Sequence, residues 1–169
     1  AGIGYGSLVF DGNYSYPTDG PLLRIMDGPN TAVLHSGVTL TKHTNKSVDF
    51  PGTVYTQGTF EMMDNSAISK GVSPMAGAVY IADGGKFNLK GGDVTGNTGA
   101  MPRYNEQPVT RAAAETGKDL LYHGQPKYYY GAGAICSITG GTLNMTGGTV
   151  SENRGEWGAI AGIGGTLEM

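Results

Sequence analysis

The chain has 169 residues, of which 30 are glycine and only 15% are charged, and its formal net charge is −3. That length suits one domain with a continuous core, and glycines without a strict three-residue period exclude collagen. A weakly acidic chain without a basic run is a poor partner for nucleic acid or anionic membranes. No apolar run approaches the roughly 18 residues that a membrane span needs.

The first 99 residues divide into segments that repeat one pattern, in which short stretches of alternating apolar and polar residues are separated by turn residues. Residues 1–20 resemble the second half of such a segment, in which Asn13 follows an apolar residue, Phe10, by three positions. Alternating stretches bounded by glycine are typical of strand–turn–strand structure. Three further segments are a longer one, a degenerate one and a regular one: residues 21–51, 52–77 and 78–99.

Residues 100–131 break this order, because glycine pairs vanish and three prolines appear. Residues 110–122 are the one stretch with good helix formers. We expect an irregular insertion from the repeats, of the kind that often forms a binding face. Tyrosine offers a large apolar area together with a hydroxyl and is enriched at interfaces. Five tyrosines of the insertion are the candidate partner-binding residues, or else they only pin the insertion to its neighbours: Tyr104, Tyr122, Tyr128, Tyr129 and Tyr130.

Residues 134–153 form the most regular segment, in which two Gly-Gly pairs frame an alternating stretch. From the alternating stretch onward they align without gaps with residues 87–97, so that Leu143 is equivalent to Phe87 and Asn153 to Asn97. Residues 159–169 begin a further copy. Equivalent positions from Ala32 to Leu167 are spaced by 28, 27, 56 and 24 residues. Periods of roughly 20–50 residues indicate a solenoid, and the spacing of 56 fits either two repeats or one repeat plus an insertion.

The sequence therefore predicts an all-β fold over residues 1–169, a single-stranded parallel β-helix of about six rungs with one large insertion. A rung here is one circuit of the coil. Side chains alternate inward and outward along each strand, so equivalent residues should stack in columns. The predicted inward columns are Ala32, Phe60, Phe87, Leu143 and Leu167; Leu34, Met62, Leu89, Met145 and Met169; Leu40, Ile68, Val94 and Val150; and Ile81, Ile138 and Ile163.

Two kinds of polar or reactive residue receive a structural interpretation. Asn13, Asn97 and Asn153 each follow an inward apolar residue by three positions. Asparagine tolerates left-handed backbone and can bond nearby backbone groups, so we expect a column of corner residues with stacked amides. Cys136 is the only cysteine, which rules out an intrachain disulfide, and we expect it inside the coil as a small buried side chain.

Two short motifs carry a resemblance to a known class of protein. Residues 77–79, 133–135 and 158–160 read Gly-Ala-Val or Gly-Ala-Ile, and residues 10–13 read Phe-Asp-Gly-Asn. They resemble the GGA(I/L/V) and FxxN repeats of polymorphic outer-membrane and adhesin-like bacterial surface proteins. The first glycine of GGA is missing in all three copies. The resemblance implies a right-handed parallel β-helix displayed outside the cell.

Parallel β-helices also include polysaccharide lyases and hydrolases, which use clustered carboxylates or calcium. In this chain the acids are scattered, and the outward column beside Leu143 is mixed: Glu61, Asn88, Asn144 and Glu168. The three histidines show no metal-binding spacing. We therefore predict no catalytic residues, no metal and no cofactor.

Two functions remain open on this reading. The first is a non-enzymatic, extracellular structural or adhesive protein, a solenoid segment of a cell-surface fibre. Its partners would be copies of itself or neighbouring solenoid segments end to end, and host or matrix glycans or proteins. The second is a polysaccharide-binding or polysaccharide-cleaving protein with a pectate-lyase-like fold.

Overall fold

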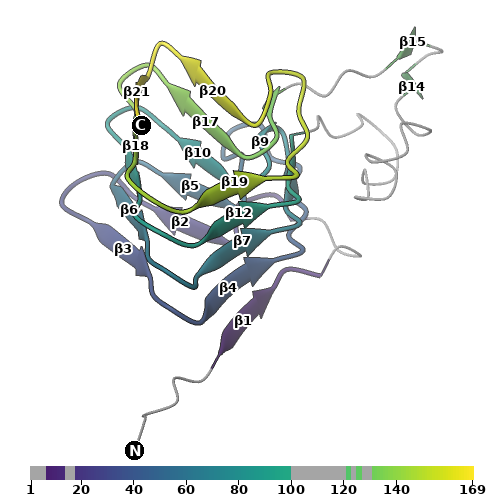
Figure 1. Ribbon diagram of the computed structural model, residues 1–169. Coiled ribbons are helices and arrows are strands. Elements are labelled where there is room, and N and C mark those ends of the chain that lie inside the picture. The colour runs from purple at the N-terminus through teal and green to yellow at the C-terminus, as the bar shows by residue number, and fades with distance from the viewer. Residues whose placement is uncertain (1–6, 14–17, 100–120, 123–124, 127–130) are drawn as a thin grey trace, which may run out of the picture.

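The computed structural model describes residues 7–13, 18–99, 121–122, 125–126 and 131–169, and every regular element in them is a β-strand (Figure 1). Fifteen of the strands form three parallel five-stranded sheets. The first sheet has the order β1 (Leu8–Asp11), β4 (Val38–Thr41), β7 (Ala67–Ser69), β12 (Asp93–Thr95), β19 (Thr149–Ser151). The second has β2 (Leu23–Ile25), β5 (Val54–Thr56), β10 (Val79–Ile81), β17 (Ile135–Ile138), β20 (Ile160–Ile163). The third has β3 (Thr31–Leu34), β6 (Thr59–Met62), β11 (Lys86–Leu89), β18 (Thr142–Met145), β21 (Thr166–Glu168).

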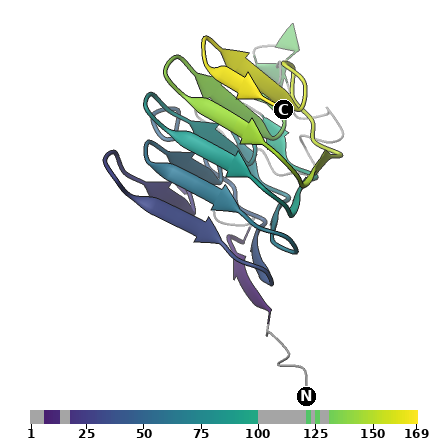
Figure 2. The same cartoon turned by 60° about the vertical axis from the view of Figure 1, so that its left-hand side comes forward.

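The chain visits the second, third and first sheets in turn, so each rung gives one strand to each sheet. The result is a right-handed β-solenoid, in which successive rungs rise from the N-terminal to the C-terminal end (Figures 1 and 2). The predicted parallel β-helix is confirmed. Four rungs are complete, with β1 before them and β20 and β21 after them, so the predicted count of about six includes two partial rungs.

The long spacing of 56 residues between equivalent positions holds one rung plus the insertion. Phe87 pairs directly with Leu143 in neighbouring strands, which leaves no room for another rung between them. The chain leaves the coil after β13 (Thr98–Gly99) and returns at β16 (Gly131–Ala132). Gly99 lies against the carbonyl group of Ala132 at this point, so the two ends of the insertion are close together.

Four short strands lie between the first and second sheets, at one corner of the coil. β8 (Val72–Ser73) pairs with β13, and β9 (Met75–Ala76) pairs with β16, both in parallel.

Within the insertion, β14 (Leu121–Tyr122) and β15 (Gln125–Pro126) form an antiparallel pair. The rest of residues 110–122, where the sequence favours helix, lies outside the described residues.

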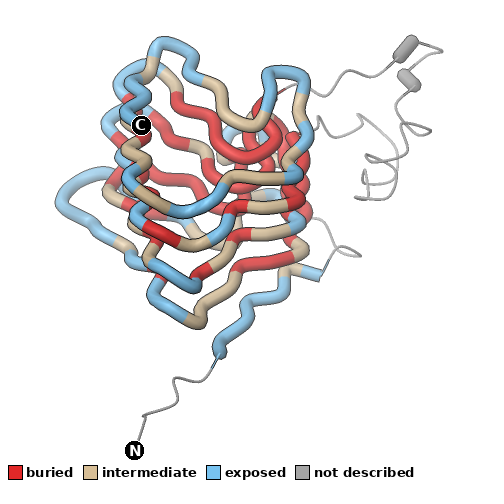
Figure 3. Tube along the Cα trace, in the orientation of Figure 1, coloured by how far each residue is buried: buried red, intermediate tan, exposed pale blue. Residues whose placement is uncertain are grey.

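The core fills the inside of the coil in its middle rungs, where the buried residues gather (Figure 3). The strand registers place the members of the first three predicted columns level with one another, up to Leu167, Met145 and Val150. The rings of Phe60 and Phe87 stack with their centroids 5.1 Å apart. Stacked aromatic rings and aliphatic side chains of this kind supply most of the folding free energy of such a coil.

The fourth predicted inward column is wrong in two members. Ile81 lies in the core as predicted, but it is level with Ser137. Ile138 pairs with Ile163, and both lie on the outward side. The prediction matched the isoleucines to one another because their side chains are alike. In the structure the two rungs stay aligned without a gap up to the next glycine turn, and this alignment shifts the isoleucines by one position. Because sides alternate along a strand, Ser137 points inward and Ile138 points outward.

Cys136 is buried, as expected, but not inside the coil. It is level with Tyr80 on the outward side of the second sheet. There it belongs to a second, smaller apolar cluster with Ala76 and Ala132. Burial raises the pKa of its thiol to about 11, so it is a poor nucleophile at neutral pH.

Candidate interaction surfaces

The candidate tyrosines of the insertion cannot be placed as a group. Tyr104, Tyr128, Tyr129 and Tyr130 lie outside the described residues. Tyr122 lies in β14, opposite Gln125 of β15. The hypothesis of a tyrosine binding cluster therefore stays a prediction.

The asparagine column contains an amide-to-amide contact between two rungs. Both the backbone N–H and the side-chain amide of Asn97 donate to Oδ1 of Asn153, each at 2.9 Å. One rung earlier the column holds Gly71, whose N–H donates to Oδ1 of Asn97 at 2.8 Å. Asn97 is fully buried, so these bonds satisfy polar groups that would otherwise destabilise the corner.

Left-handed backbone occurs mostly one position before this column. Glu152 has φ 55°, Lys42 has φ 54° and Gly96 has φ 62°. Asn13 differs, because it is itself left-handed with φ 50°, and its N–H donates to the carboxylate of Asp11. Asn97 and Asn153 thus serve as hydrogen-bonding groups, while the residue before each makes the sharp bend.

His43 occupies the same column in the first complete rung and is 2% exposed. Its Nε2 lies 2.9 Å from the carbonyl oxygen of Gly20 and 3.3 Å from Oγ1 of Thr18. A carbonyl oxygen only accepts, so Nε2 carries the proton and donates to Gly20. Nδ1 is buried and has no hydrogen-bond partner among the described residues. Burial lowers the pKa of His43, which makes it a neutral structural side chain.

An aromatic column on the outward side of the second sheet escaped the sequence analysis. Tyr55 and Tyr80 stack with centroids 5.6 Å apart, and Phe50 meets Tyr55 edge to face at 5.4 Å. The guanidinium carbon of Arg24 lies 3.7 Å from the centre of the Phe50 ring. Tyr55 and Tyr80 hold the same position of successive rungs, which is a signal that inspection of inward columns alone does not reveal.

The outward column of the third sheet begins with Val33 in β3 and is polar and internally bonded from β6 onward. Glu61, Asn88, Asn144 and Glu168 are level with one another. Lys90 Nζ and Asn88 Nδ2 each donate to the carboxylate of Glu61, at 2.9 and 3.0 Å. The bond from Lys90 lowers the pKa of Glu61 more than any other contact. In the described part of the chain, no group of three or more His, Cys, Asp or Glu side chains is placed to hold a metal ion.

Both ends of the coil expose apolar side chains. On β1, Leu8, Val9 and Phe10 are 54%, 55% and 46% exposed. At the other end, Leu167 is 38% and Met169 is 85% exposed. Isolated apolar residues on a surface are common, whereas strand edges lined with them favour pairing with further strands.

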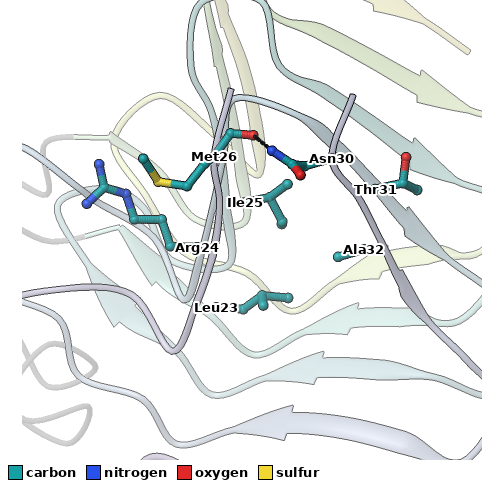
Figure 4. Close-up of a pocket in the computed structure, with 7 residues that line it drawn as sticks. All are labelled: Leu23, Arg24, Ile25, Met26, Asn30, Thr31 and Ala32. Carbon is teal, nitrogen blue, oxygen red and sulfur yellow. Dashed lines mark hydrogen bonds between the residues drawn. The ribbon is translucent and has the colours of Figure 1, made fainter. Parts of the chain in front are cut away.

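A cavity of about 320 Å³ lies at the N-terminal end, between strands β2 and β3 (Figure 4). Its apolar lining comes from Leu23, Ile25 and Ala32, whose side chains lie between the two strands. Asn30 and Met26 close one side through a bond from Asn30 Nδ2 to the Met26 carbonyl oxygen at 3.4 Å. The cavity is thus an unfilled part of the coil interior.

The comparisons give no relative, since no protein-family model, no curated protein and no solved structure matches this chain. Among the described residues, no helix has the length and apolar character needed to cross a membrane.

Proposed function

We propose that this protein is a non-enzymatic structural or adhesive segment of a bacterial surface solenoid, located outside the cell. The observation that carries the proposal is the regularity of the coil, in which three parallel five-stranded sheets enclose one apolar core. In such a coil each rung contacts its neighbours, so the same structure can be lengthened rung by rung into a fibre.

The surface between the ends agrees with this role. The outward side of the first sheet carries Thr41, Ser69 and Thr95 level with one another. The hydroxyls of Thr41 and Ser69 lie 2.9 Å apart, within hydrogen-bonding distance. Short side chains bonded to their neighbours make a stiff polar wall, which suits a spacer or stalk.

The location and the form of the protein test the proposal together. Antibodies against the chain should label intact cells of the source organism, and protease added outside should remove the label. Electron microscopy of the native material should then show rods or fibres. Label that appears only after the cells are broken would contradict the proposal.

The aromatic column favours a second candidate, binding of a polysaccharide. Tyr80 and Phe50 are both partly exposed, and partly exposed aromatic side chains are a usual component of sugar-binding surfaces. A glycan array probed with the unaltered chain and with Phe50→Ala should show glycan signals that the variant loses. A reducing-sugar assay on the bound glycans separates binding from cleavage.

A further inference from the structure

The connections between strands differ in length according to the corner of the coil at which they lie. Connections from the second sheet to the third, and from the third to the first, contain at most five residues. Every connection from the first sheet to the second contains at least eight, namely residues 12–22, 42–53, 70–78, 96–134 and 152–159. Long connections of a solenoid gather on one face, and that face is often the one that binds. The second sheet begins at this corner and is therefore well placed to carry a ligand.

The outward side of the second sheet carries the aromatic column, whose members lie in successive rungs. Arg24, Tyr55 and Tyr80 are level with one another in β2, β5 and β10. Phe50 reaches them from the connection of residues 42–53 and meets the ring of Tyr55 edge to face. Neighbouring members of the column are separated by one strand spacing, about 4.8 Å. The column thus presents a row of side chains along the axis of the coil.

Arg24 is a cation that pairs with no carboxylate in the described part of the chain. The ion pairs present there join other cations, Lys42, Lys46 and Lys90, to acidic side chains. Arg24 is exposed and points to the side of β2 opposite to Leu23 (Figure 4). Its guanidinium lies over the Phe50 ring, 3.7 Å from the centroid, and a guanidinium that stacks through its flat face keeps its N–H edge for an acceptor. A carboxylate accepts two parallel hydrogen bonds from such an edge.

The hydroxyls of Tyr55 and Tyr80 are further hydrogen-bonding groups of this row. Neither of them is among the buried side-chain atoms that lack a hydrogen-bond partner in the described residues. Tyr80 is partly exposed. Burial of its ring raises the pKa of Tyr80 to about 12, so the hydroxyl keeps its proton at neutral pH and can both donate and accept.

The connection that carries Phe50 is held in one conformation by hydrogen bonds. Asn45 is 2% exposed, and its Nδ2 donates to the carbonyl oxygens of Phe50 at 2.7 Å and Gly52 at 2.9 Å. The N–H of Phe50 donates to Oγ of Ser47 at 3.1 Å, and the N–H of Gly52 donates to Oγ of Ser73 at 2.6 Å. Groups that are fixed before a ligand arrives lose little freedom when it binds.

We propose that the aromatic column binds a polysaccharide of uronic acids, with a carboxylate of the ligand on the N–H edge of Arg24 and sugar hydroxyls on the hydroxyl of Tyr80. The inference rests on the proposed binding of a polysaccharide and specifies its chemistry. The carboxylate supplies the anion that Arg24 lacks. The chain has a net charge of −3, so it has no general attraction for polyanions, and the preference for an acid depends on this one cation.

An extended peptide fits the column less well than a polysaccharide. The strands that carry the two tyrosines, β5 and β10, are paired on both sides within the second sheet. They therefore offer no free edge to which a peptide strand could add. A row of hydroxyls and one guanidinium along the coil matches a ligand that carries hydroxyls and carboxylates along its own length.

Oligosaccharides of glucuronate, mannuronate and guluronate, each beside its neutral methyl ester, test the role of the charge. Calorimetric titration of the unaltered chain should show at least one acid that binds about tenfold or more tightly than its ester. Added salt should weaken the binding of the acid and leave that of the ester unchanged. Equal affinities for acids and esters, or binding of none of them, would overturn the inference.

Three variants assign the preference to the column. Arg24→Gln should weaken binding of the acid about tenfold or more and leave binding of the ester as it is. Lys86→Gln removes an equally exposed cation from the third sheet and should keep the preference. Tyr80→Phe should weaken acid and ester alike, by a factor of roughly 2–10. Equal weakening of acid binding by Arg24→Gln and Lys86→Gln would overturn the role of Arg24. The comparison of acid with ester uses the unaltered chain, so it decides the matter even where a variant does not fold.

A further probe and the glycan array separate this inference from the proposed function. Binding of polyglutamate as tightly as the best uronate would show that the column recognises carboxylates alone, and it would overturn the inference. Array signals from neutral glycans alone would overturn it too, and would leave polysaccharide binding standing. An empty array together with label on intact cells would overturn both and leave the surface role.

Discussion

At the scale of the residue, the direction of a side chain decides its contribution to stability. Leu143 is fully buried and continues the column of Phe87, whereas its neighbour Thr142 points outward and is half-buried. Leu143→Ala should lower the free energy of unfolding by about 2–5 kcal/mol, and Thr142→Ala by less than about 0.5 kcal/mol. Urea unfolding of both variants measures this, and equal losses would contradict the inward and outward assignment.

The buried imidazole of His43 predicts a dependence of stability on pH. Burial lowers its pKa in the folded chain, while the unfolded value is about 6.5. The unfolded state therefore binds the proton more readily, so stability is complete above that value and falls as the pH drops below it. Thermal unfolding between pH 7 and pH 5 should show this loss.

Two variants assign the loss to this residue. His43→Asn, which supplies the side chain found elsewhere in the column, should flatten the dependence on pH between pH 7 and pH 5. His35 is exposed, so His35→Asn should leave the dependence as it is. A profile that is unchanged in the first variant would mean that other groups cause the acid loss.

Sequence predicts some residue positions well and others poorly, for a physical reason. The columns of Phe87, Leu89 and Val94 could be predicted because an apolar side chain inside the coil leaves a strict alternation in the sequence. Ile138 and Ile163 were misassigned because they were matched to Ile81 by side-chain type, whereas the register sets Ser137 opposite Ile81. Tyr55 was missed because it lies on the outward side of its strand, where the alternation predicts a polar residue.

At the scale of the element, the insertion joins the coil at one place. Gly99 lies against Ala132, so removing residues 101–128 leaves chain ends that a short linker can join at small entropic cost. We expect the shortened chain to keep a β-rich far-UV circular dichroism spectrum and to lose binding to partners of the tyrosines. A shortened chain that unfolds would show instead that the insertion stabilises the coil.

The boundaries of the strands were only partly predictable. Glycine pairs mark the turns before β11 and β18 clearly, since Gly84 and Gly140 both have positive φ, 75° and 81°. The turns of the first rungs use Lys42, Lys70 and Asn65 with φ between 54° and 58°. Lysine at such a position gives no signal in the sequence, because its side chain carries no preference for left-handed backbone. The early repeats therefore looked degenerate although their rungs are regular.

At the scale of the whole molecule, each rung contacts its neighbours alone, and cooperativity must pass from rung to rung. Stability of such a coil is close to a sum of rung terms and of contacts between neighbouring rungs. The central rungs are covered on both sides, as Phe60 and Phe87 show at 0% exposure, whereas β1 at the N-terminal end is exposed throughout. The ends of a single chain should therefore open before its middle.

The same residue type at the middle and at the end provides the final prediction. Phe87 is fully buried in β11 and stacks on Phe60, whereas Phe10 in β1 is 46% exposed. Phe87→Ala should cost about 3–5 kcal/mol and remove hydrogen-exchange protection from both halves of the coil. Phe10→Ala should cost less than about 1.5 kcal/mol and free the amides of β1 and β4 alone. Because both variants delete the same atoms, a similar cost and a similar exchange pattern for the two would mean that the coil unfolds as one block and that neighbouring-rung contacts do not set its stability.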